Sequence, residues 1–227
     1  MSNILVNIKG LDSKEFPKGV TPLQIMKDIK GVSKDSIICK IDGELKDLSS
    51  TLKKDCELQF MDAKSKDGHS VLLHSTAHLM AQAVKRLFPK TKVTIGPYLE
   101  NRFYYDFDVE TPFTEDDLLK IENEMIKISE ENHEITHEVK SRDEALTYFE
   151  KIEENYKVEI INDLDKDEIL KVYSQGEFTD LCRGPHVQST GQIKHFKLLS
   201  SSAAYWRGDE KNQTLQRVYG TSFQNSK

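Results

Sequence analysis

The chain has 227 residues, of which 37% are hydrophobic and 31% charged, and its formal net charge is -6. No run approaches the roughly 20 apolar residues of a membrane helix, and the N-terminus MSNILVNIKG lacks a secretion signal, so we expect a cytoplasmic protein with no membrane partner. Three cysteines give no disulfide framework and fit a reducing compartment. The acidic balance argues against a general nucleic-acid binder, because non-specific binding to phosphates depends on Lys and Arg.

Residues 1–62 have the pattern of a small α+β domain. NILVNI alternates as a strand, and Thr21 and Pro22 open a helix as its N-cap and first helical position. The strands IICKID and CELQFM follow, separated by the turn DGE. This order predicts a small sheet with one packed helix, in which Cys39 and Cys56 are small core residues.

A polar segment, DAKSKDGHS, separates this domain from the rest of the chain. Its charge and glycine content are typical of an interdomain linker, which we place at residues 63–69, with a second domain at residues 70–227. Ser70 then caps a helix that Pro89 ends. Apolar residues recur at helical spacing along it, which predicts an amphipathic helix.

The second domain is predicted to be α+β as well. Thr114 with Asp117, and Ser141 with Glu144, have the spacing of capping boxes that open two helices. The expected strands are two around a turn in KVTIGPYLENRFYYDFDV, then HEITHEV, YKVEIIND, HFKLLSSSAAYW and LQRVYGTSF.

Two histidines, His74 and His78, lie four residues apart in the predicted helix. This spacing puts them on one face about one turn, roughly 5.4 Å, apart, so both can reach a single metal ion. His133 and His137 have the same spacing in an alternating strand pattern, where four residues span about 13 Å and one ion cannot bridge them. We interpret that second pair as surface residues, so the spacing alone is weak support for a metal site.

The segment TDLCRGPHV adds Cys182 and His186, again four residues apart, in a turn or loop made by Gly184 and Pro185. Two helix histidines with this Cys and His would complete a tetrahedral set of three nitrogens and one sulfur, which suits zinc. The set lacks the glutamate that serves as the base in HExxH motifs, and Asp180 is the nearest candidate for that role. The candidate metal ligands are thus His74, His78, Cys182 and His186.

The second domain resembles the editing domain of threonyl-tRNA synthetases in four stretches: HSTAHLMAQAVKRLFP, IGPYLENRFYYDFD, FTDLCRGPHVQSTGQI and AYWRGDEKNQTLQRVYGTSF. Alanyl-tRNA editing domains share the His and Cys/His pattern, but RGPH followed by YWRGDEKN is closer to the threonyl family. In the first domain, PKGVTPLQIMKDI followed by IDGELKDLSSTL resembles the TGS domain. The resemblance implies a ubiquitin-like β-grasp domain followed by a larger α+β editing domain with a sheet packed against helices.

The family continues into a class II catalytic domain and an anticodon-binding domain, neither of which fits after Lys227. We therefore expect an N-terminal piece of a threonine-tRNA ligase, with no ATP site and no aminoacylation site. The expected partners are the acceptor end of tRNA(Thr) carrying serine and the remaining synthetase domains. The family's ligase is dimeric through the absent part, so we expect the fragment to be a monomer.

The resemblance implies post-transfer editing, the hydrolysis of serine wrongly attached to tRNA(Thr). It implies that the site is lined by the histidines and cysteine, with Asp180 and Lys157 as charged partners and Tyr104 or Tyr105 as a contact to adenine or ribose. The alternative without a functional role is that Lys157 is a solvated lysine at a strand edge. Two interpretations are open for the basic residues near the C-terminus: contact with the acceptor stem of the tRNA, or charged side chains that are only solvated. These residues are Arg183, Lys194, Lys197, Arg207 and Arg217.

Two mechanisms share these residues. A zinc ion would lower the pKa of a bound water to about 7 and present hydroxide to the ester. A catalytic zinc keeps an open coordination place, which four protein ligands would close, so we favour a mechanism without a cofactor. A histidine would then orient water with help from Asp180 or a substrate ribose hydroxyl.

The alternative function is a module that docks the tRNA acceptor arm without independent hydrolytic activity. A nucleotide-binding regulator is disfavoured because no GxxxxGK[ST] motif is present. A metallohydrolase of small esters is a more distant alternative. Trp206, the single tryptophan, is predicted to be a packed anchor for the site loop.

Overall fold

The structure is a computed structural model that describes residues 2–223; residues 1 and 224–227, at the outer ends of the two predicted domains, lie outside the described residues. The chain divides into two compact units. The first contains residues 1–72 and 184–188, and the second contains residues 73–183 and 189–227. Within the described residues, no helix is long and apolar enough to cross a membrane.

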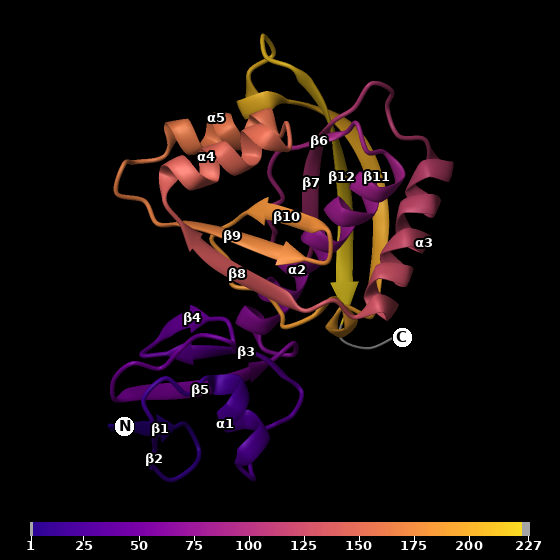
Figure 1. The fold of residues 1–227 in the computed structure, drawn as a ribbon. Helices are drawn as coiled ribbons and strands as arrows, with labels where there is room; N and C mark the ends of the chain where they lie inside the picture. Colours follow the sequence, from indigo (N-terminus) through magenta and orange to yellow (C-terminus); the bar gives the residue numbers. More distant parts are fainter. Residues whose placement is uncertain (1, 224–227) are drawn as a thin grey trace. The chain divides into compact units, whose positions relative to one another are not determined.

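The first unit contains a five-stranded sheet, one short helix and the start of the long helix that follows (Figure 1). Its elements are β1 (Asn3–Ile8), β2 (Lys14–Pro17), α1 (Pro22–Asp28), β3 (Ser36–Ile41), β4 (Glu44–Lys46) and β5 (Cys56–Asp62). The strand order is β2-β1-β5-β3-β4, with β1 and β5 parallel and the other neighbours antiparallel. Strand β1 alternates between exposed and buried residues, and its buried side packs with Ile25 and Met26 of α1.

Local signals in this unit are confirmed. The Thr21 side chain accepts a hydrogen bond from the Gln24 backbone N–H, and the Gln24 side-chain oxygen accepts one from the Thr21 N–H. Cys39 and Cys56 are buried, as predicted. The observed sheet and helix agree with the predicted α+β class, and the specific ubiquitin-like β-grasp identity stays a prediction.

The central helix α2 (Lys66–Leu87) begins four positions before the predicted cap Ser70. Residues 66–69 of the expected linker are therefore helical. The Gly68 N–H donates to Ser65 Oγ at 3.1 Å, which is the contact of an N-cap serine. The polar composition of this segment thus reflects helix capping as well as a connection.

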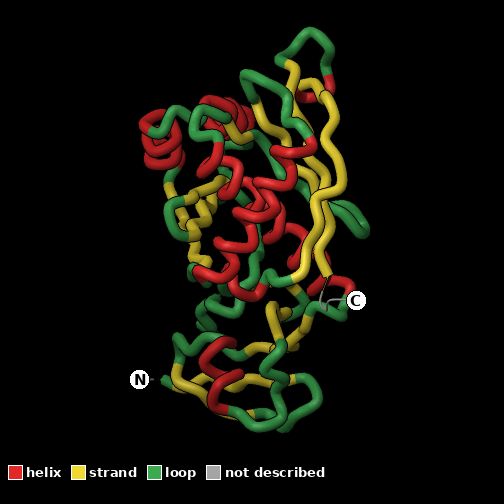
Figure 2. Tube along the Cα trace, turned by 90° about the vertical axis from the view of Figure 1, so that its right-hand side faces the viewer, coloured by secondary structure: helices red, strands yellow, loops and turns green. Residues whose placement is uncertain are grey.

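The second unit contains two antiparallel sheets with helices around and between them (Figure 2). The strands are β6 (Lys92–Val93), β7 (Phe103–Asp108), β8 (Ile135–Lys140), β9 (Leu170–Gln175), β10 (Phe178–Leu181), β11 (His195–Tyr205) and β12 (Thr214–Phe223). The helices that follow α2 are α3 (Glu115–Glu131), α4 (Arg142–Lys151) and α5 (Asn155–Asp163), with short 3-10 turns η1 (Thr190–Gln192) and η2 (Trp206–Gly208). The sheet orders are β10-β9-β8 and β11-β12-β7-β6. Both predicted capping boxes are confirmed, at the starts of α3 and α4.

The prediction that α2 is amphipathic is wrong for most of its length. Residues 71–84 are buried, except the half-buried His74. The ring of His78 packs against Tyr105 of one sheet and Phe178 of the other. A helix between two sheets has no solvent-facing side, so its small polar residues are buried along with its apolar ones.

The prediction of a strand at YKVEIIND is also wrong, because this segment forms α5. Ile161 and the partly buried Val158 pack with Phe149 of α4, at the three-residue spacing of a helix face. The β-branched residues suggested a strand, but this packing overrides that weak preference. Lys157 consequently lies inside the unit, 2% exposed, and is not a solvated lysine at a strand edge.

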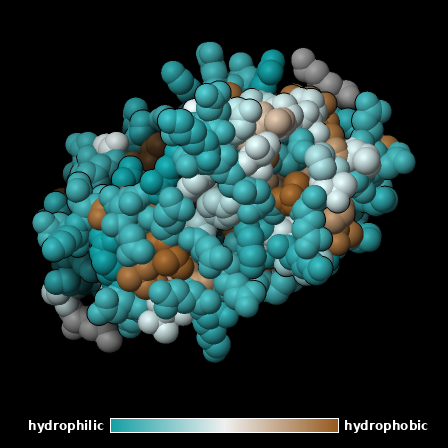
Figure 3. All heavy atoms as spheres, turned by 90° about the horizontal axis from the view of Figure 1, so that it is seen from above, coloured by the Kyte–Doolittle hydropathy of each residue, from teal (hydrophilic) through white to brown (hydrophobic). Residues whose placement is uncertain are grey.

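Apolar side chains are concentrated in the cores of the two units. In the first unit, strand and helix residues form a continuous cluster, and a smaller cluster joins α4, α5 and β9 in the second. The face shown in Figure 3 is mostly hydrophilic, with small and separate hydrophobic areas. The charged fraction of the sequence is therefore largely a surface property.

Ile121 and Ile126 provide a matched test of how α3 packs. Ile121 is fully buried, whereas Ile126 is 44% exposed. Truncating a buried isoleucine costs about 2–5 kcal/mol, because it leaves a cavity, whereas a surface substitution usually stays within about 0.5 kcal/mol. In urea denaturation, we expect Ile121→Ala to lower the free energy of unfolding by the larger amount, about 2–5 kcal/mol. We expect Ile126→Ala to change it by no more than about 0.5 kcal/mol. Equal losses would contradict the packing of α3.

Candidate functional site

A cluster of buried polar side chains lies in the second unit, where α2, β7, α5 and β10 meet. His78, Tyr105, Lys157 and Asp180 are each at most 3% exposed. Buried charges are costly unless they are paired and hydrogen-bonded. The burial of these groups is therefore stable only if they are paired and hydrogen-bonded with one another.

The ammonium of Lys157 has three oxygen partners. Its Nζ lies 2.5 Å from Asp180 Oδ1, 2.6 Å from the Thr94 carbonyl oxygen and 3.2 Å from the Tyr105 hydroxyl. The Tyr105 hydroxyl in turn donates to Asp180 Oδ2 at 2.7 Å. An ammonium has three donors, so these contacts satisfy the buried charge.

Asp180 remains ionised despite its burial. Burial alone would raise the pKa of its carboxyl group, but Lys157, His78 and the hydrogen bonds from Lys157 and Tyr105 lower that pKa below its usual value. The His78 Nε2 atom lies 3.6 Å from Asp180 Oδ2. The carboxylate therefore presents a fixed negative charge beside the histidines.

Both helix histidines are neutral at physiological pH. Burial lowers the pKa of His78 to about 3, although Asp180 opposes the shift. Burial likewise lowers the pKa of His74 to about 4, against the opposing effects of Asp180 and a hydrogen bond to the Gly96 backbone. The two rings lie 5.1 Å apart between centroids. A neutral imidazole has one nitrogen that can accept a proton or bind a metal.

Cys182 joins this pair from the segment directly after β10. Its Sγ lies 2.9 Å from His74 Nε2. One ligand atom from each of His74, His78 and Cys182 lies within 4.8 Å of the others. The structure thus brings together three of the four residues that the sequence predicts as ligands.

His186, the fourth predicted ligand, lies in residues 184–188, which belong to the first unit. His186 is 1% exposed, and its backbone N–H donates to Asp47 Oδ1 at 2.9 Å within that unit. The segment is irregular, as predicted, with Gly184 at φ 67 and a cis Gly184–Pro185 peptide bond. Its membership of the ligand set stays a prediction.

The donor types of the helix histidines and Cys182 fit zinc, since two imidazole nitrogens and a thiolate are common zinc ligands. Bond lengths of about 2.0 Å for nitrogen and about 2.3 Å for sulfur place two tetrahedral ligands about 3.5 Å apart. The 2.9 Å between His74 and Cys182 is shorter and is the spacing of a direct hydrogen bond. The pair would have to separate slightly to hold the ion.

The two adjacent tyrosines of β7 point to opposite faces of the sheet. Tyr105 is fully buried, and its hydroxyl is engaged by Lys157 and Asp180. Tyr104 lies under Arg217, whose guanidinium carbon is 4.0 Å from the ring centroid. The structure therefore brings Tyr105 into the cluster and leaves Tyr104 outside it.

Most of the basic residues considered for tRNA contact are paired with carboxylates. Arg183 contacts Glu168 at 2.9 Å, and Lys197 contacts Glu122 at 2.6 Å. The guanidinium of Arg217 binds both oxygens of Asp106, and that of Arg207 contacts Glu159 and Asp163. Lys194 is exposed. These pairs leave little net positive charge at the predicted contact residues.

The segment between β6 and β7 contributes residues to the site that were not predicted, although it lies in one of the stretches that carry the resemblance. It supplies the Thr94 carbonyl to Lys157, and the Tyr98 ring lies 6.0 Å from the His74 ring. A Cβ atom on Gly96 would lie 2.2 Å from the Tyr105 ring, so only glycine fits between this segment and the cluster. The Gly-Pro pair in TIGPY, together with the resemblance of IGPYLENRFYYDFD to the editing domain, is the signal in the sequence that pointed to this segment.

Helix α5, which carries Lys157, is held at two points. Glu154 precedes the helix, is 2% exposed and accepts hydrogen bonds from Lys85 Nζ and the Val93 N–H. Trp206 is buried and donates from Nε1 to Glu159 on the same helix. Trp206 is thus a packed anchor, as predicted, but it anchors a helix and not a loop.

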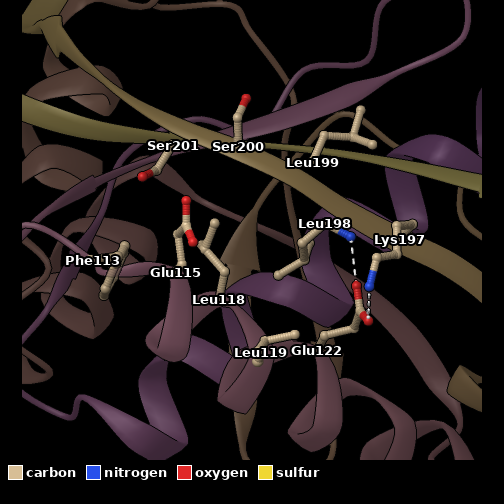
Figure 4. Close-up of a pocket in the computed structure, with 10 residues that line it drawn as sticks. All are labelled: Phe113, Glu115, Leu118, Leu119, Glu122, Lys197, Leu198, Leu199, Ser200 and Ser201. Carbon is tan, nitrogen blue, oxygen red and sulfur yellow. Dashed lines mark hydrogen bonds and ion pairs between the residues drawn. The ribbon is translucent and has the colours of Figure 1, made fainter.

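A concave region lies between α3 and β11, away from the buried cluster (Figure 4). This cavity of about 430 Å³ includes Leu118, Leu119 and residues 197–201 in its lining. The carboxylate of Glu122 accepts from Lys197 and from the Leu198 backbone, as Figure 4 shows. No histidine or cysteine is among the lining residues that Figure 4 labels.

Two comparisons show which known proteins this chain is similar to. Residues 170–219, which include Asp180 and Cys182, match the family described as the threonyl and alanyl tRNA synthetase second additional domain. The chain is 51% identical over 228 residues to a threonine–tRNA ligase of Pelobacter propionicus, covering 100% of this chain and 36% of the relative. A threonine–tRNA ligase of Symbiobacterium thermophilum is 49% identical over 215 residues, covering 94% of this chain and 33% of the relative.

A third relative, the threonine–tRNA ligase of Acetivibrio thermocellus, is 46% identical over 221 residues, or 97% of this chain and 35% of the relative. The chain therefore spans about a third of the length of the curated relatives it matches. Over nearly all of its residues, this chain is similar to part of the threonine–tRNA ligases, and it carries a match to a second additional domain of the threonyl and alanyl synthetases.

Proposed function

We propose that this chain is the editing part of a threonine–tRNA ligase and hydrolyses the ester that joins serine to tRNA(Thr). The observation that carries the proposal is the pair of neutral imidazoles beside an ionised, buried Asp180. Similarity to threonine–tRNA ligases supplies the substrate class.

Such a hydrolase answers a physical limit on specificity. Serine lacks one methyl group of threonine, and a difference of that size supplies only about 1–3 kcal/mol of discrimination. A synthetic site therefore accepts serine at an appreciable rate. A second site that admits the smaller ester and cleaves it removes the error.

In the proposed reaction, water attacks the ester carbonyl carbon, and the C–O bond to the ribose breaks. His74 is half-buried, whereas His78 is 3% exposed, so His74 is the imidazole that substrate can approach. Its neutral ring accepts a proton from the attacking water at Nε2, where the water replaces the contact with Cys182 Sγ, and then gives that proton to the departing ribose oxygen. Serine and the free ribose hydroxyl are the products.

The remaining residues position this reaction. Lys157 holds Asp180 ionised, and Asp180 lies beside His78. His78 packs against the His74 ring at 5.1 Å between centroids. We propose that this chain of contacts keeps the His74 ring oriented toward the ester.

The preferred mechanism needs no cofactor, and zinc is the alternative. The residues of this unit that would hold the ion are His74, His78 and Cys182, whose ligand atoms lie within 4.8 Å of one another. When bound, zinc would lower the pKa of a water molecule and so supply hydroxide at neutral pH.

The competing function is a docking module that binds the acceptor arm without hydrolysis. Such a module needs an accessible positive face, because affinity for RNA backbone comes from Lys and Arg. The pairing of Lys197, Arg207 and Arg217 with carboxylates counts against it. Activation of threonine with ATP, and contacts with further synthetase domains, are proposals for the longer proteins that the relatives represent.

Replacing His74 should abolish hydrolysis. We expect wild-type protein to release serine from seryl-tRNA(Thr) faster than the spontaneous rate, and His74→Ala to be slower by about 100-fold or more, because a proton acceptor is lost. His137→Ala is the matched control, since His137 lies on β8 outside the cluster. The measurement is release of labelled serine by variants whose circular dichroism is unchanged. Wild-type release at the spontaneous rate would leave only the docking function, and full activity in His74→Ala would remove that ring from the mechanism.

Metal removal tests the choice between the two mechanisms. We expect serine release to persist in a chelator, because the preferred mechanism uses only protein groups. The measurement pairs metal analysis of purified protein with the release assay before and after dialysis against chelator. Stoichiometric zinc, with activity that is lost on chelation and restored by zinc, would overturn the metal-free mechanism.

A further inference from the structure

We propose that Glu154 is a positioning residue of the hydrolytic site, because its carboxylate fixes the stretch of backbone whose carbonyl receives Lys157. It acts on the reaction through Lys157 and Asp180, and not by contact with the ester. This inference rests on the proposed function, since it names a further residue on which the rate of that hydrolysis depends.

Glu154 is a buried carboxylate that the proposed reaction does not use. The residue is 2% exposed and lies directly before α5, three residues ahead of Lys157. Its Oε1 atom lies 2.6 Å from Lys85 Nζ, and its Oε2 atom accepts the Val93 N–H at 3.0 Å. Val93 is 1% exposed, so loss of the carboxylate would leave a buried N–H without its partner.

Two side chains at the start of α5 hold two consecutive residues of the segment that begins at β6. Glu154 binds the Val93 N–H, and Lys157 donates to the Thr94 carbonyl oxygen at 2.6 Å. The backbone N–H of Lys157 also donates to the Glu154 carbonyl at 3.0 Å, which fixes the spacing between the two side chains. The contact with Val93 therefore sets where the Thr94 carbonyl lies relative to the Lys157 ammonium.

The place of the Thr94 carbonyl matters because the Lys157 ammonium has three donors to satisfy. Its other partners are Asp180 Oδ1 at 2.5 Å and the Tyr105 hydroxyl at 3.2 Å. If the carbonyl shifts, one donor loses its partner in a buried position, and the ammonium moves away from the place where it meets Asp180. The carboxylate beside His78 then loses its fixed position.

Glu122 offers a matched control in the same unit. Its carboxylate makes the same two kinds of contact, with Lys197 Nζ at 2.6 Å and with the Leu198 N–H at 2.8 Å. These contacts join α3 to β11, away from the buried cluster. An effect that comes only from losing an ion pair and a backbone hydrogen bond would therefore appear at both glutamates.

The decisive experiment compares three variants in the serine-release assay. We expect Glu154→Ala to lower kcat about tenfold or more, because a small displacement of the site slows the reaction. The KM for seryl-tRNA(Thr) should change by less than about twofold, since no contact with substrate is removed. Glu154→Gln keeps an oxygen for the Val93 N–H and should retain at least about a third of the wild-type kcat. Glu122→Ala should behave as wild type.

Three results would overturn the inference: a wild-type kcat in Glu154→Ala, an equal loss of kcat in Glu154→Gln, or an equal loss in Glu122→Ala. If Glu154→Ala does not fold, Glu154→Asp takes its place with the same expected loss. Its carboxylate is one methylene shorter, so it keeps the charge for Lys85 but draws back from the Val93 N–H.

The Lys157 ammonium provides a measurement that does not depend on hydrolysis. In protein whose lysines carry an NMR-active nitrogen isotope, its protons should exchange slowly with water, because the group is buried and hydrogen-bonded. We expect this exchange to be about tenfold faster or more in Glu154→Ala and unchanged in Glu122→Ala. If wild-type protein releases no serine, the proposed function fails, and this measurement still decides whether Glu154 positions Lys157. Equal exchange in wild type and Glu154→Ala would overturn the inference.

Discussion

The buried ion pair between Lys157 and Asp180 is the contact on which the candidate site depends. Desolvating an ammonium and a carboxylate costs several kcal/mol for each ion, and their attraction repays this only when the remaining hydrogen bonds are also made. The Thr94 carbonyl and the Tyr105 hydroxyl make those bonds. Segments from β6 to β10 must therefore all be in place before the pair is stable, which explains the anchoring of α5 by Glu154 and Trp206.

Burial, and not the charge of Asp180, sets the protonation states of the histidines beside the pair. An ionised Asp180 favours protonated imidazoles, yet burial outweighs it and lowers the pKa of both His74 and His78. The result is a fixed negative charge beside two neutral rings. That arrangement leaves both rings unprotonated at neutral pH, which is the form of imidazole that binds metal.

The sequence predicted the ends of the site better than its centre. The spacing of His74 and His78 pointed to one cluster, as did the segment of Cys182. Residues four apart on a helix remain neighbours whatever the rest of the fold does. Lys157 was placed on a strand because its β-branched neighbours favour one, and the packing that makes α5 a helix involves Phe149, which no local pattern connects to it. The burial of α2 on all sides could not be predicted from its own sequence either. It depends on the two sheets that pack against it, which are formed by residues far away in the chain.

The three tyrosines between Tyr98 and Tyr105 show a second limit of sequence reasoning. Tyr98, Tyr104 and Tyr105 are close together in the chain, but strand alternation and one hairpin send their rings into three different environments. A motif identifies the segment that matters without saying which of its rings is exposed. Exposure depends on Arg217 and Asp180, which lie far away in the sequence.

The central claim is that an ionised Asp180, held by Lys157, lies beside two neutral imidazoles, and an NMR titration of the histidine rings in metal-free protein tests it directly. We predict midpoints of about 4 for His74 and about 3 for His78. Because these values lie below the unfolded value of about 6.5, the free energy of unfolding should fall as the pH is lowered from about 6.5 toward 4. Midpoints near 6.5 for both rings would contradict the account, since the histidines would then be ordinary solvated side chains.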